Sequence, residues 1–249
     1  MPGTKGFDRP VRAAVIGASG GIGRAFVEEL AAADAVATVL ALSRRGEAPT
    51  GDKIEAGRID TDDEASIAAA AAAAKEAMGG LDLVLVATGM LHGPEGVQPE
   101  KTWRQLEPEA MLRLYRTNTV GPALVAKHFL PLLPREGRCV FAAISARVGS
   151  IEDNGLGGWH SYRASKAALN MLLKNFAIEF GRKNDQAVVV GLHPGTVDTR
   201  LSSPFQGGVP EGKLFTPAYS AEAMLATLDE LGGADSGGLF AYDGERLPY

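Results

Sequence analysis

Short apolar runs alternate with segments of helical spacing along the whole chain. The apolar runs predict strands at 11–16, 37–42, 54–59, 81–87, 138–144, 187–192 and 238–242. The segments between them predict helices at 22–33, 63–78, about 109–133 and about 160–183, and Pro122 and Pro131 are placed to bend or end the third. Strands that alternate with helices form parallel sheets, and no linker or repeat interrupts the pattern. The sequence therefore predicts one α/β domain over residues 1–249.

A glycine-rich turn joins the first predicted strand to the first predicted helix. Gly17, Gly21 and Gly23 have the spacing G-x-x-x-G-x-G, with Ser19 and Ile22 between them. Such glycines allow a tight turn and a close approach of the backbone to a pyrophosphate, while the helix N-terminus offers unpaired N–H groups. The turn predicts a dinucleotide site, and a flexible turn without a ligand is the alternative.

Tyr162 and Lys166 lie one helical turn apart in the last long helix. Residues four apart share a helix face, and a nearby ammonium favours the phenolate. We therefore expect Lys166 to lower the pKa of Tyr162 and to make it an acid or base near neutral pH. The alternative is a tyrosine at the edge of the core and a lysine in solvent.

Composition narrows the classes of function. The net charge of −5 and the absence of a basic tract argue against nucleic acid as a partner. The single cysteine, Cys139, forms no intrachain disulfide, and the first eight residues hold no apolar run, so we expect a cytoplasmic protein without a signal peptide. The longest apolar run, 65–77, is rich in alanine and too short to span a membrane. No metal is expected, and the histidines, including His193, are interpreted as structural or surface residues.

With these motifs in this order, the chain resembles the short-chain dehydrogenase/reductase family, classical type, over essentially its whole length. The stretch 145–170, with Gly157-Gly158-Trp159, is similar to the C-factor-like carbonyl reductase branch. The resemblance implies a Rossmann-type, doubly wound sheet of seven parallel strands in the order 3-2-1-4-5-6-7, with helices on both faces. It also implies a core over 8–195, a substrate-covering loop at about 196–218, and a homodimer or homotetramer.

The resemblance also implies roles for individual residues. Tyr162 would protonate the alkoxide that forms in a reduction, Lys166 would bind the nicotinamide ribose, and Asn118 would orient a water near the lysine. Asp60 matches a residue that contacts adenine, and Ala87-Thr88-Gly89 stands where the family usually has Asn-Asn-Ala-Gly. The expected cofactor contacts are Gly17, Ser19, Gly21, Ile22, Gly23, Ser43, Arg44, Asp60, Ala87, Thr88, Gly89, Tyr162, Lys166, Pro194, Gly195, Thr196, Val197 and Thr199.

The sequence departs from the family at the serine that polarises the substrate carbonyl. The family strand ends in Ser-Ser, whereas this chain has Ser145 followed by Ala146. Ser145 can rotate into the role, Ser150 can reach back, or the hydroxyl is missing. Ser145 is the favoured candidate.

The end of the second strand indicates the cofactor. A carboxylate there binds the ribose 2′-hydroxyl of NAD, and an arginine binds the 2′-phosphate of NADP. Residues 40–45 contain Ser43 and Arg44 and no acidic residue, which favours NADP over NAD, although Gly20 stands where NADP enzymes often have a basic residue. A solvated arginine turn, with NAD as the cofactor, is the alternative.

The leading hypothesis is an NADP(H)-dependent oxidoreductase that transfers hydride between nicotinamide and a carbonyl or alcohol substrate. A signalling or nucleotide-sensing protein with little turnover is the alternative, and it would need neither Tyr162 nor Lys166. Dehydrogenation of a hydroxysteroid, dihydrodiol or sugar-like alcohol is a third hypothesis. The sequence does not identify the substrate.

Overall fold

The computed structural model describes residues 2–93 and 96–249. Strands β3, β2, β1, β4, β5, β6, β9 and β10 form one sheet in that order. The predicted order of seven parallel strands is confirmed, because every neighbouring pair from β3 to β9 is parallel. The sheet gains one strand that the sequence did not predict, β10, which runs antiparallel to β9. The strands are β1 Val11–Ile16, β2 Val36–Ser43, β3 Ile54–Arg58, β4 Leu83–Val86, β5 Cys139–Ile144, β6 Ala187–His193, β9 Leu239–Ala241 and β10 Arg246–Leu247.

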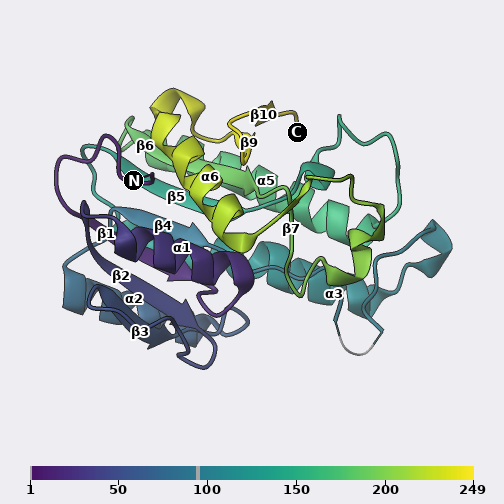
Figure 1. The fold of residues 1–249 in the computed structure, drawn as a ribbon, viewed down its shortest axis with the longest axis horizontal. Helices are drawn as coiled ribbons and strands as arrows, with labels where there is room; N and C mark the ends of the chain where they lie inside the picture. The colour runs from purple at the N-terminus through teal and green to yellow at the C-terminus, as the bar shows by residue number, and fades with distance from the viewer. Residues whose placement is uncertain (1, 94–95) are drawn as a thin grey trace.

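Helices cover both faces of the sheet, as expected for this fold (Figure 1). Helices α1 (Gly21–Ala32) and α6 (Pro217–Glu230) lie on one face, and α2 (Glu64–Met78), α4 (Gly121–Phe129) and α5 (His160–Gly181) lie on the other. Side chains of β1 alternate between the two layers, since Ala13 and Val15 pack toward α1 while Ala14 and Ile16 pack toward α2. The strands are therefore apolar on both sides, which is why they appear in the sequence as continuous apolar runs.

The third predicted helix, at about 109–133, is divided into parts. Helix α3 (Pro108–Tyr115) runs into a π-helical turn, η2 (Arg116–Val120), and then into α4 and the short 3-10 helix η3 (Leu130–Leu132). Pro122 has no N–H to donate, and the wider turn before it is closed by Gly121 N donating to Arg116 O. Such π turns occur often at functional sites, and this one carries Asn118.

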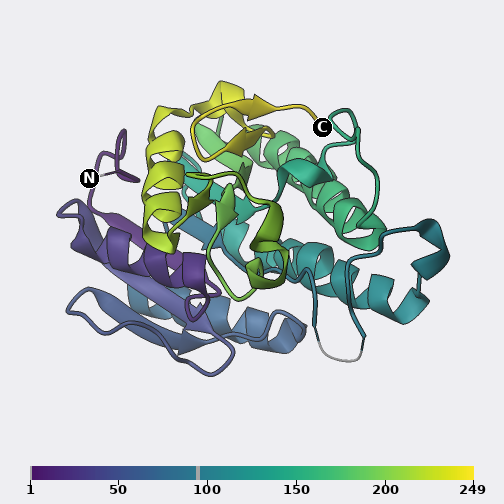
Figure 2. The same ribbon diagram turned by 45° about the vertical axis from the view of Figure 1, so that its right-hand side comes forward.

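The loops at the carboxyl ends of β1, β4, β5 and β6 meet at one edge of the sheet. The segment between β6 and α6 contains β7 (Thr196–Val197), η5 (Ser203–Gly208) and β8 (Leu214–Phe215), and β7 pairs with β8. In Figure 2 this segment, in green, lies between α6 and the helices α3 and α5. The other short helices are η1 Trp103–Gln105, η4 Arg147–Gly149 and η6 Gly233–Asp235. In the described ranges, no helix has the length and apolar character needed to cross a bilayer.

Candidate active site

A cavity of about 940 Å³ opens where the carboxyl ends of the central strands meet. It lies beside β1 and β4, where the strand order reverses, which is the position at which sheets of this kind bind ligands. Most of the residues predicted for the site line it: Gly21, Ile22, Arg44, Ala87, Thr88, Gly89, Ser145, Tyr162, Lys166, Pro194, Gly195, Thr196, Val197 and Thr199. The predicted residues that do not line it are Gly17, Ser19, Gly23, Ser43, Asp60 and Asn118.

The glycine turn is shaped by contacts that exclude larger side chains. Gly17 has a φ of +94°, and a Cβ on Gly23 would lie 2.2 Å from the carbonyl oxygen of Gly17. A Cβ on Gly21 would lie 2.8 Å from Cγ2 of Thr199. Gly17 and Gly23 therefore let helix α1 start directly against the end of β1. Gly21 lets the segment after β6 approach this helix N-terminus.

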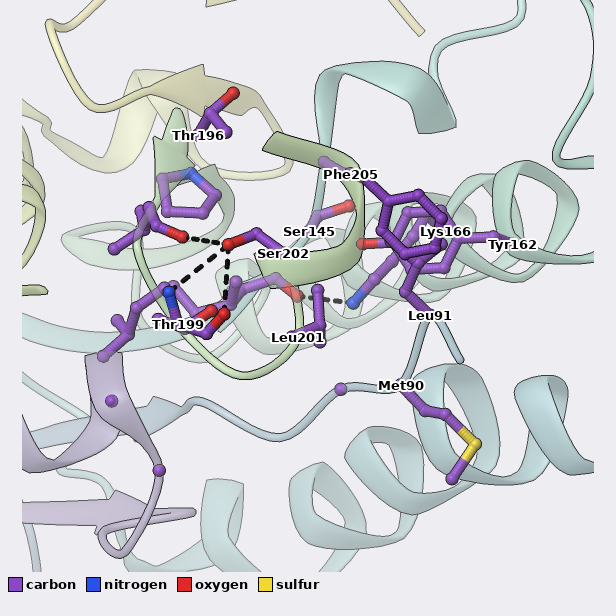
Figure 3. Close-up of a pocket in the computed structure, with 18 of the residues that line it drawn as sticks. Met90, Leu91, Ser145, Tyr162, Lys166, Thr196, Thr199, Leu201, Ser202 and Phe205 are labelled. Atoms are coloured by element: carbon purple, nitrogen blue, oxygen red, sulfur yellow. Dashed lines mark hydrogen bonds between the residues drawn. The ribbon is translucent and has the colours of Figure 1, made fainter. Parts of the chain in front are cut away.

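Tyr162 and Lys166 project from α5 into the cavity (Figure 3). Lys166 is 2% exposed; its Nζ donates to Ile144 O at 2.9 Å and lies 5.9 Å from the centre of the Tyr162 ring. Burial raises the pKa of Tyr162 to about 12 and lowers the pKa of Lys166 to about 8. The expectation that Lys166 lowers the pKa of Tyr162 is therefore wrong for this geometry, because desolvation dominates for both groups.

The start of α5 is fixed by an unusual contact. Trp159 precedes the helix with a φ of +50°, and its N–H donates to Glu100 O at 2.6 Å. The Glu100 carboxylate is buried and accepts from Ser161 N at 3.2 Å and from the Ser161 hydroxyl. A negative charge at a helix N-terminus is stabilising. Glu100 thus orients the turn of α5 that carries Tyr162.

Asn118 ties the loop after β4 to helix α5. Its Oδ1 accepts from Met90 N at 2.8 Å, and its Nδ2 donates to Met90 O at 2.8 Å and to Ser165 Oγ at 3.0 Å. A Cβ on Gly89 would lie 3.7 Å from both Asn118 Oδ1 and Lys166 Nζ. Asn118 is fully buried and adjoins the region around Lys166 without lining the cavity.

Neither candidate serine presents a free hydroxyl to the cavity, because the Ser145 hydroxyl is engaged and Ser150 does not line the cavity. Ser145 lines the cavity, but its hydroxyl donates to Asn170 Oδ1 at 2.6 Å. Ser150 is buried outside the lining, and its Oγ accepts from Asp153 N at 3.0 Å. Ala146 does line the cavity and packs in one apolar cluster with Tyr162.

The far end of the cavity is marked by Arg44, which follows β2 and is exposed. Ser43 is 3% exposed and donates to Glu47 O at 2.8 Å, so its hydroxyl is engaged within the protein. Asp60 accepts from Asp62 N at 3.1 Å and stays outside the lining. Thr88 Oγ1 is buried and has no hydrogen-bond partner among the residues that the structure describes. The glycine turn, the unpartnered hydroxyl and the cationic end together fit a phosphorylated dinucleotide.

The middle of the cavity is apolar and aromatic, and sequence reasoning did not identify its apolar side chains. Phe205 from η5 stands edge-on to Trp159, with ring centres 5.3 Å apart, and Trp159 stands edge-on to Tyr162 at 6.2 Å. Leu201, Leu91 and Met90 also line this part, and Figure 3 shows Leu201 and Leu91 near Lys166, with Met90 farther away. Two sequence signals pointed to it: Trp159 in its Gly-Gly-Trp motif, and the substrate-covering loop expected at about 196–218, which contains Leu201 and Phe205. Within residues 2–93 and 96–249, no group of His, Cys, Asp or Glu side chains is arranged to hold a metal ion.

A sequence model of the family described as short chain dehydrogenase matches residues 12–207. The glycine turn, all of β1 except Val11, and the Tyr162–Lys166 pair fall within this match. The chain belongs to the short-chain dehydrogenase family. It is therefore an oxidoreductase of this family, as the fold and the sequence motifs predicted.

The relatives extend the comparison over most of the chain. A 1-hydroxy-2-glutathionyl-2-methyl-3-butene dehydrogenase of Rhodococcus sp. is 34% identical over 202 residues, covering 81% of this chain and 83% of the relative. The C-signal protein of Myxococcus xanthus is 34% identical over 139 residues, covering 56% of this chain and 78% of the relative. The solved structure of an NADPH-bound carbonyl reductase from chicken fatty liver superposes with a TM-score of 0.81 at 28% identity, covering 98% of this chain and 96% of the other. The predicted likeness to C-factor-like carbonyl reductases is confirmed.

Proposed function

We propose that this protein is an NADP(H)-dependent oxidoreductase that transfers hydride between nicotinamide and a carbonyl or alcohol substrate. The observation that carries the proposal is one cavity that holds Tyr162 and Lys166 in its apolar part and reaches Arg44 beyond the glycine turn. The NADPH-bound state of the chicken carbonyl reductase supports the same class of cofactor. NAD is the alternative cofactor.

Tyr162 is the acid of the proposed reduction. With a pKa of about 12 its hydroxyl is protonated at neutral pH, so it holds a proton to give to an alkoxide. Lys166 is fixed by its bond to Ile144 O, which leaves its remaining N–H groups for a ribose or for the phenolate that forms. Asn118 holds the loop after β4 against α5 and so keeps Lys166 in place.

The cofactor would lie along the carboxyl edge of the sheet. It supplies the hydride when bound. Gly21 and Ile22 would face its pyrophosphate, Thr88 offers a free hydroxyl, and Arg44 would meet a 2′-phosphate. Residues 194–199 would lie along its nicotinamide end, and the segment at about 196–218 would cover the substrate.

Turnover and its dependence on Tyr162 test the proposal. NADPH consumption is followed with a panel of aldehydes, ketones and diketones. Because Tyr162→Phe removes the transferable proton and keeps the ring, we expect kcat to fall at least ~10²-fold while NADPH binding stays nearly unchanged. Tyr219→Phe, on the exposed side of α6 and outside the cavity, is the matched control and should be as active as the wild type.

A signalling or nucleotide-sensing role is the alternative, and the similarity to C-signal favours it. The same experiment separates the two. NADPH binding without turnover on any carbonyl would contradict the enzymatic proposal in favour of this alternative. Turnover that survives Tyr162→Phe would instead remove Tyr162 from the mechanism.

We also propose a homodimer or homotetramer in the cytoplasm. Exposed apolar side chains on α3 and α5, Leu112, Met171 and Ile178, support association through this face. The chain holds one cysteine, Cys139, which is a buried free thiol, and this supports a reducing compartment.

A further inference from the structure

Ala146 leaves a gap in the machinery proposed above. The family resemblance puts a serine hydroxyl at this position, where it would bind the substrate oxygen. The Ser145 hydroxyl has one proton, which it donates to Asn170, and Ser150 lies outside the lining. The carbonyl oxygen would therefore receive a hydrogen bond from Tyr162 and from neither serine, unless another donor stands beside it.

His193 occupies the neighbouring place on the next strand. In the parallel pair β5–β6, Ile144 is opposite Leu192, and Ser145 N donates to Leu192 O at 2.7 Å. His193 is thus the lateral neighbour of Ser145. Alternation along both strands turns these two side chains toward the sheet face that α5 covers, the helix that carries Tyr162. His193 lines the same cavity.

The surroundings of His193 keep its ring neutral. Burial is the main cause that lowers its pKa to about 4, and the positive charge of Arg147 on η4 lowers the pKa further. The negative charges of Asp243 and Glu245 raise the pKa, but by less. A neutral imidazole has one N–H and one lone pair. At neutral pH the side chain can therefore act as a donor without carrying a charge.

The two ring nitrogens of His193 are not equivalent. Nδ1 is buried and has no hydrogen-bond partner in the described part of the chain, while Nε2 is not among the buried unpartnered atoms. Among backbone groups, a buried N–H without an acceptor is rarer than an under-satisfied carbonyl oxygen, and we apply the same ranking to the two ring nitrogens. The surroundings thus favour the tautomer with the proton on Nε2, the nitrogen left to face the cavity.

We propose that His193 donates a hydrogen bond from Nε2 to the carbonyl oxygen of the substrate, in the role that Ala146 leaves open. This assignment rests on the proposed function. A fixed neutral donor in an apolar cavity stabilises negative charge that develops on this oxygen while Tyr162 delivers the proton. His193 is then a catalytic residue that the sequence motifs alone do not indicate.

The test compares two substitutions of His193 on the carbonyl that the panel identifies. His193→Phe keeps a flat ring without a donor, and we expect kcat/KM to fall at least ~10-fold, the loss of about one hydrogen bond. His193→Gln can place its amide nitrogen near the position of Nε2, so it should retain most of kcat/KM. The Kd for NADPH, measured by fluorescence titration, should stay near the wild-type value in both.

A second substitution asks whether the role is the missing hydroxyl. Ala146→Ser in the His193→Phe background should recover part of the lost kcat/KM, because it returns a donor to the cavity. A merely structural role for His193 predicts no such recovery. If His193→Phe fails to fold, the comparison of His193→Gln with His193→Asn tests the assignment instead. Asparagine is too short to reach the position of Nε2, so His193→Asn should have the lower kcat/KM.

Several results would overturn the assignment. These are wild-type kcat/KM in His193→Phe, a loss that appears in NADPH affinity instead, no recovery with Ala146→Ser, or equal rates for the Gln and Asn variants. Tyr162→Phe runs in parallel. Wild-type turnover that needs Tyr162 but not His193 would reject this inference alone, whereas no turnover at all would reject the proposed function together with it.

Discussion

Arg44 is the residue on which the proposed cofactor preference depends. It follows β2, lines the cavity and is exposed, and no acidic residue stands in 40–45. NADPH differs from NADH by a 2′-phosphate that carries about −1.5 to −2 charges at neutral pH. We therefore predict that the protein binds NADPH at least ~10-fold more tightly than NADH, and that Arg44→Ala removes most of this margin.

The size of the effect follows from the contacts available at this end of the cavity. A hydrogen bond to a charged group contributes about 1.5–3 kcal/mol, which corresponds to a factor of about 10 to 100 in affinity. Ser43 adds little, because its hydroxyl is buried and donates to Glu47 O. Arg58 adds positive charge nearby, since its Nε donates to Arg44 O at 3.3 Å. Because Arg44 is exposed, added salt should narrow the margin.

The measurement is a titration of NADPH and NADH against wild type, Arg44→Ala and Arg45→Ala at two ionic strengths. Arg45 is the matched control: it is adjacent, its side chain is 79% exposed, and it pairs with Glu47 at 3.1 Å outside the cavity. Arg45→Ala should leave both affinities near the wild-type values, and Arg44→Ala should leave NADH binding unchanged. Equal affinities for the two cofactors in the wild type, or equal effects of the two substitutions, would refute the reasoning.

Two further predictions concern packing and charge away from the cofactor. A Cβ on Gly149 would lie 2.8 Å from Lys166 Cβ and 3.0 Å from Lys166 C. Gly149→Ala should therefore lower the free energy of unfolding, measured in urea, by about 1–3 kcal/mol and should also lower kcat. Gly181→Ala is the control and should do neither, because its added Cβ would meet nothing within 4 Å. Asp82 is 1% exposed; burial alone would raise its pKa, but hydrogen bonds from Arg12 and Arg9 hold the pKa below its usual value. Asp82→Asn should cost on the order of 3 kcal/mol. The pKa of Asp82 is lower in the folded protein than in the unfolded chain. The stability that Asp82 contributes should therefore be fully present at a pH above the unfolded-state pKa, and it should be lost as the pH falls through the folded-state pKa. Glu230→Gln, in an exposed pair with Lys5, should cost at most about 1 kcal/mol. A Gly149→Ala protein as stable and active as Gly181→Ala, or Asp82→Asn no worse than Glu230→Gln, would contradict these estimates.

The sheet could be predicted because its strands are buried on both faces and therefore appear as apolar runs. The run 187–192, for example, became β6 with one added residue. Strand β10 was not predicted, because two residues carry no pattern. The π-helical turn at Arg116–Val120 was also missed, because it depends on distant contacts of Asn118 with Met90 and Ser165.

The site divides in the same way. Gly17 and Gly23 could be identified because close backbone packing admits only glycine there. Leu201 and Phe205 fall in the loop that was expected to cover the substrate, but their places in the lining, like that of Trp159, could not be predicted, because an apolar side chain at a cavity looks in the sequence like any core residue. His193 was interpreted as structural or surface, and only the position of its strand end beside Ser145 reveals that it lines the cavity.

The protonation of Tyr162 shows what a spacing cannot tell. A spacing of four residues places Tyr162 and Lys166 on one face of the helix. It does not determine where the ammonium group points or how far it is exposed to water. In the structure Nζ points to Ile144 O, and burial disfavours the charged form of both side chains. The proton therefore rests on the phenol at neutral pH. A site in this state is ready to give a proton to an oxygen, which is the requirement of carbonyl reduction; the reverse reaction must first remove that proton from Tyr162.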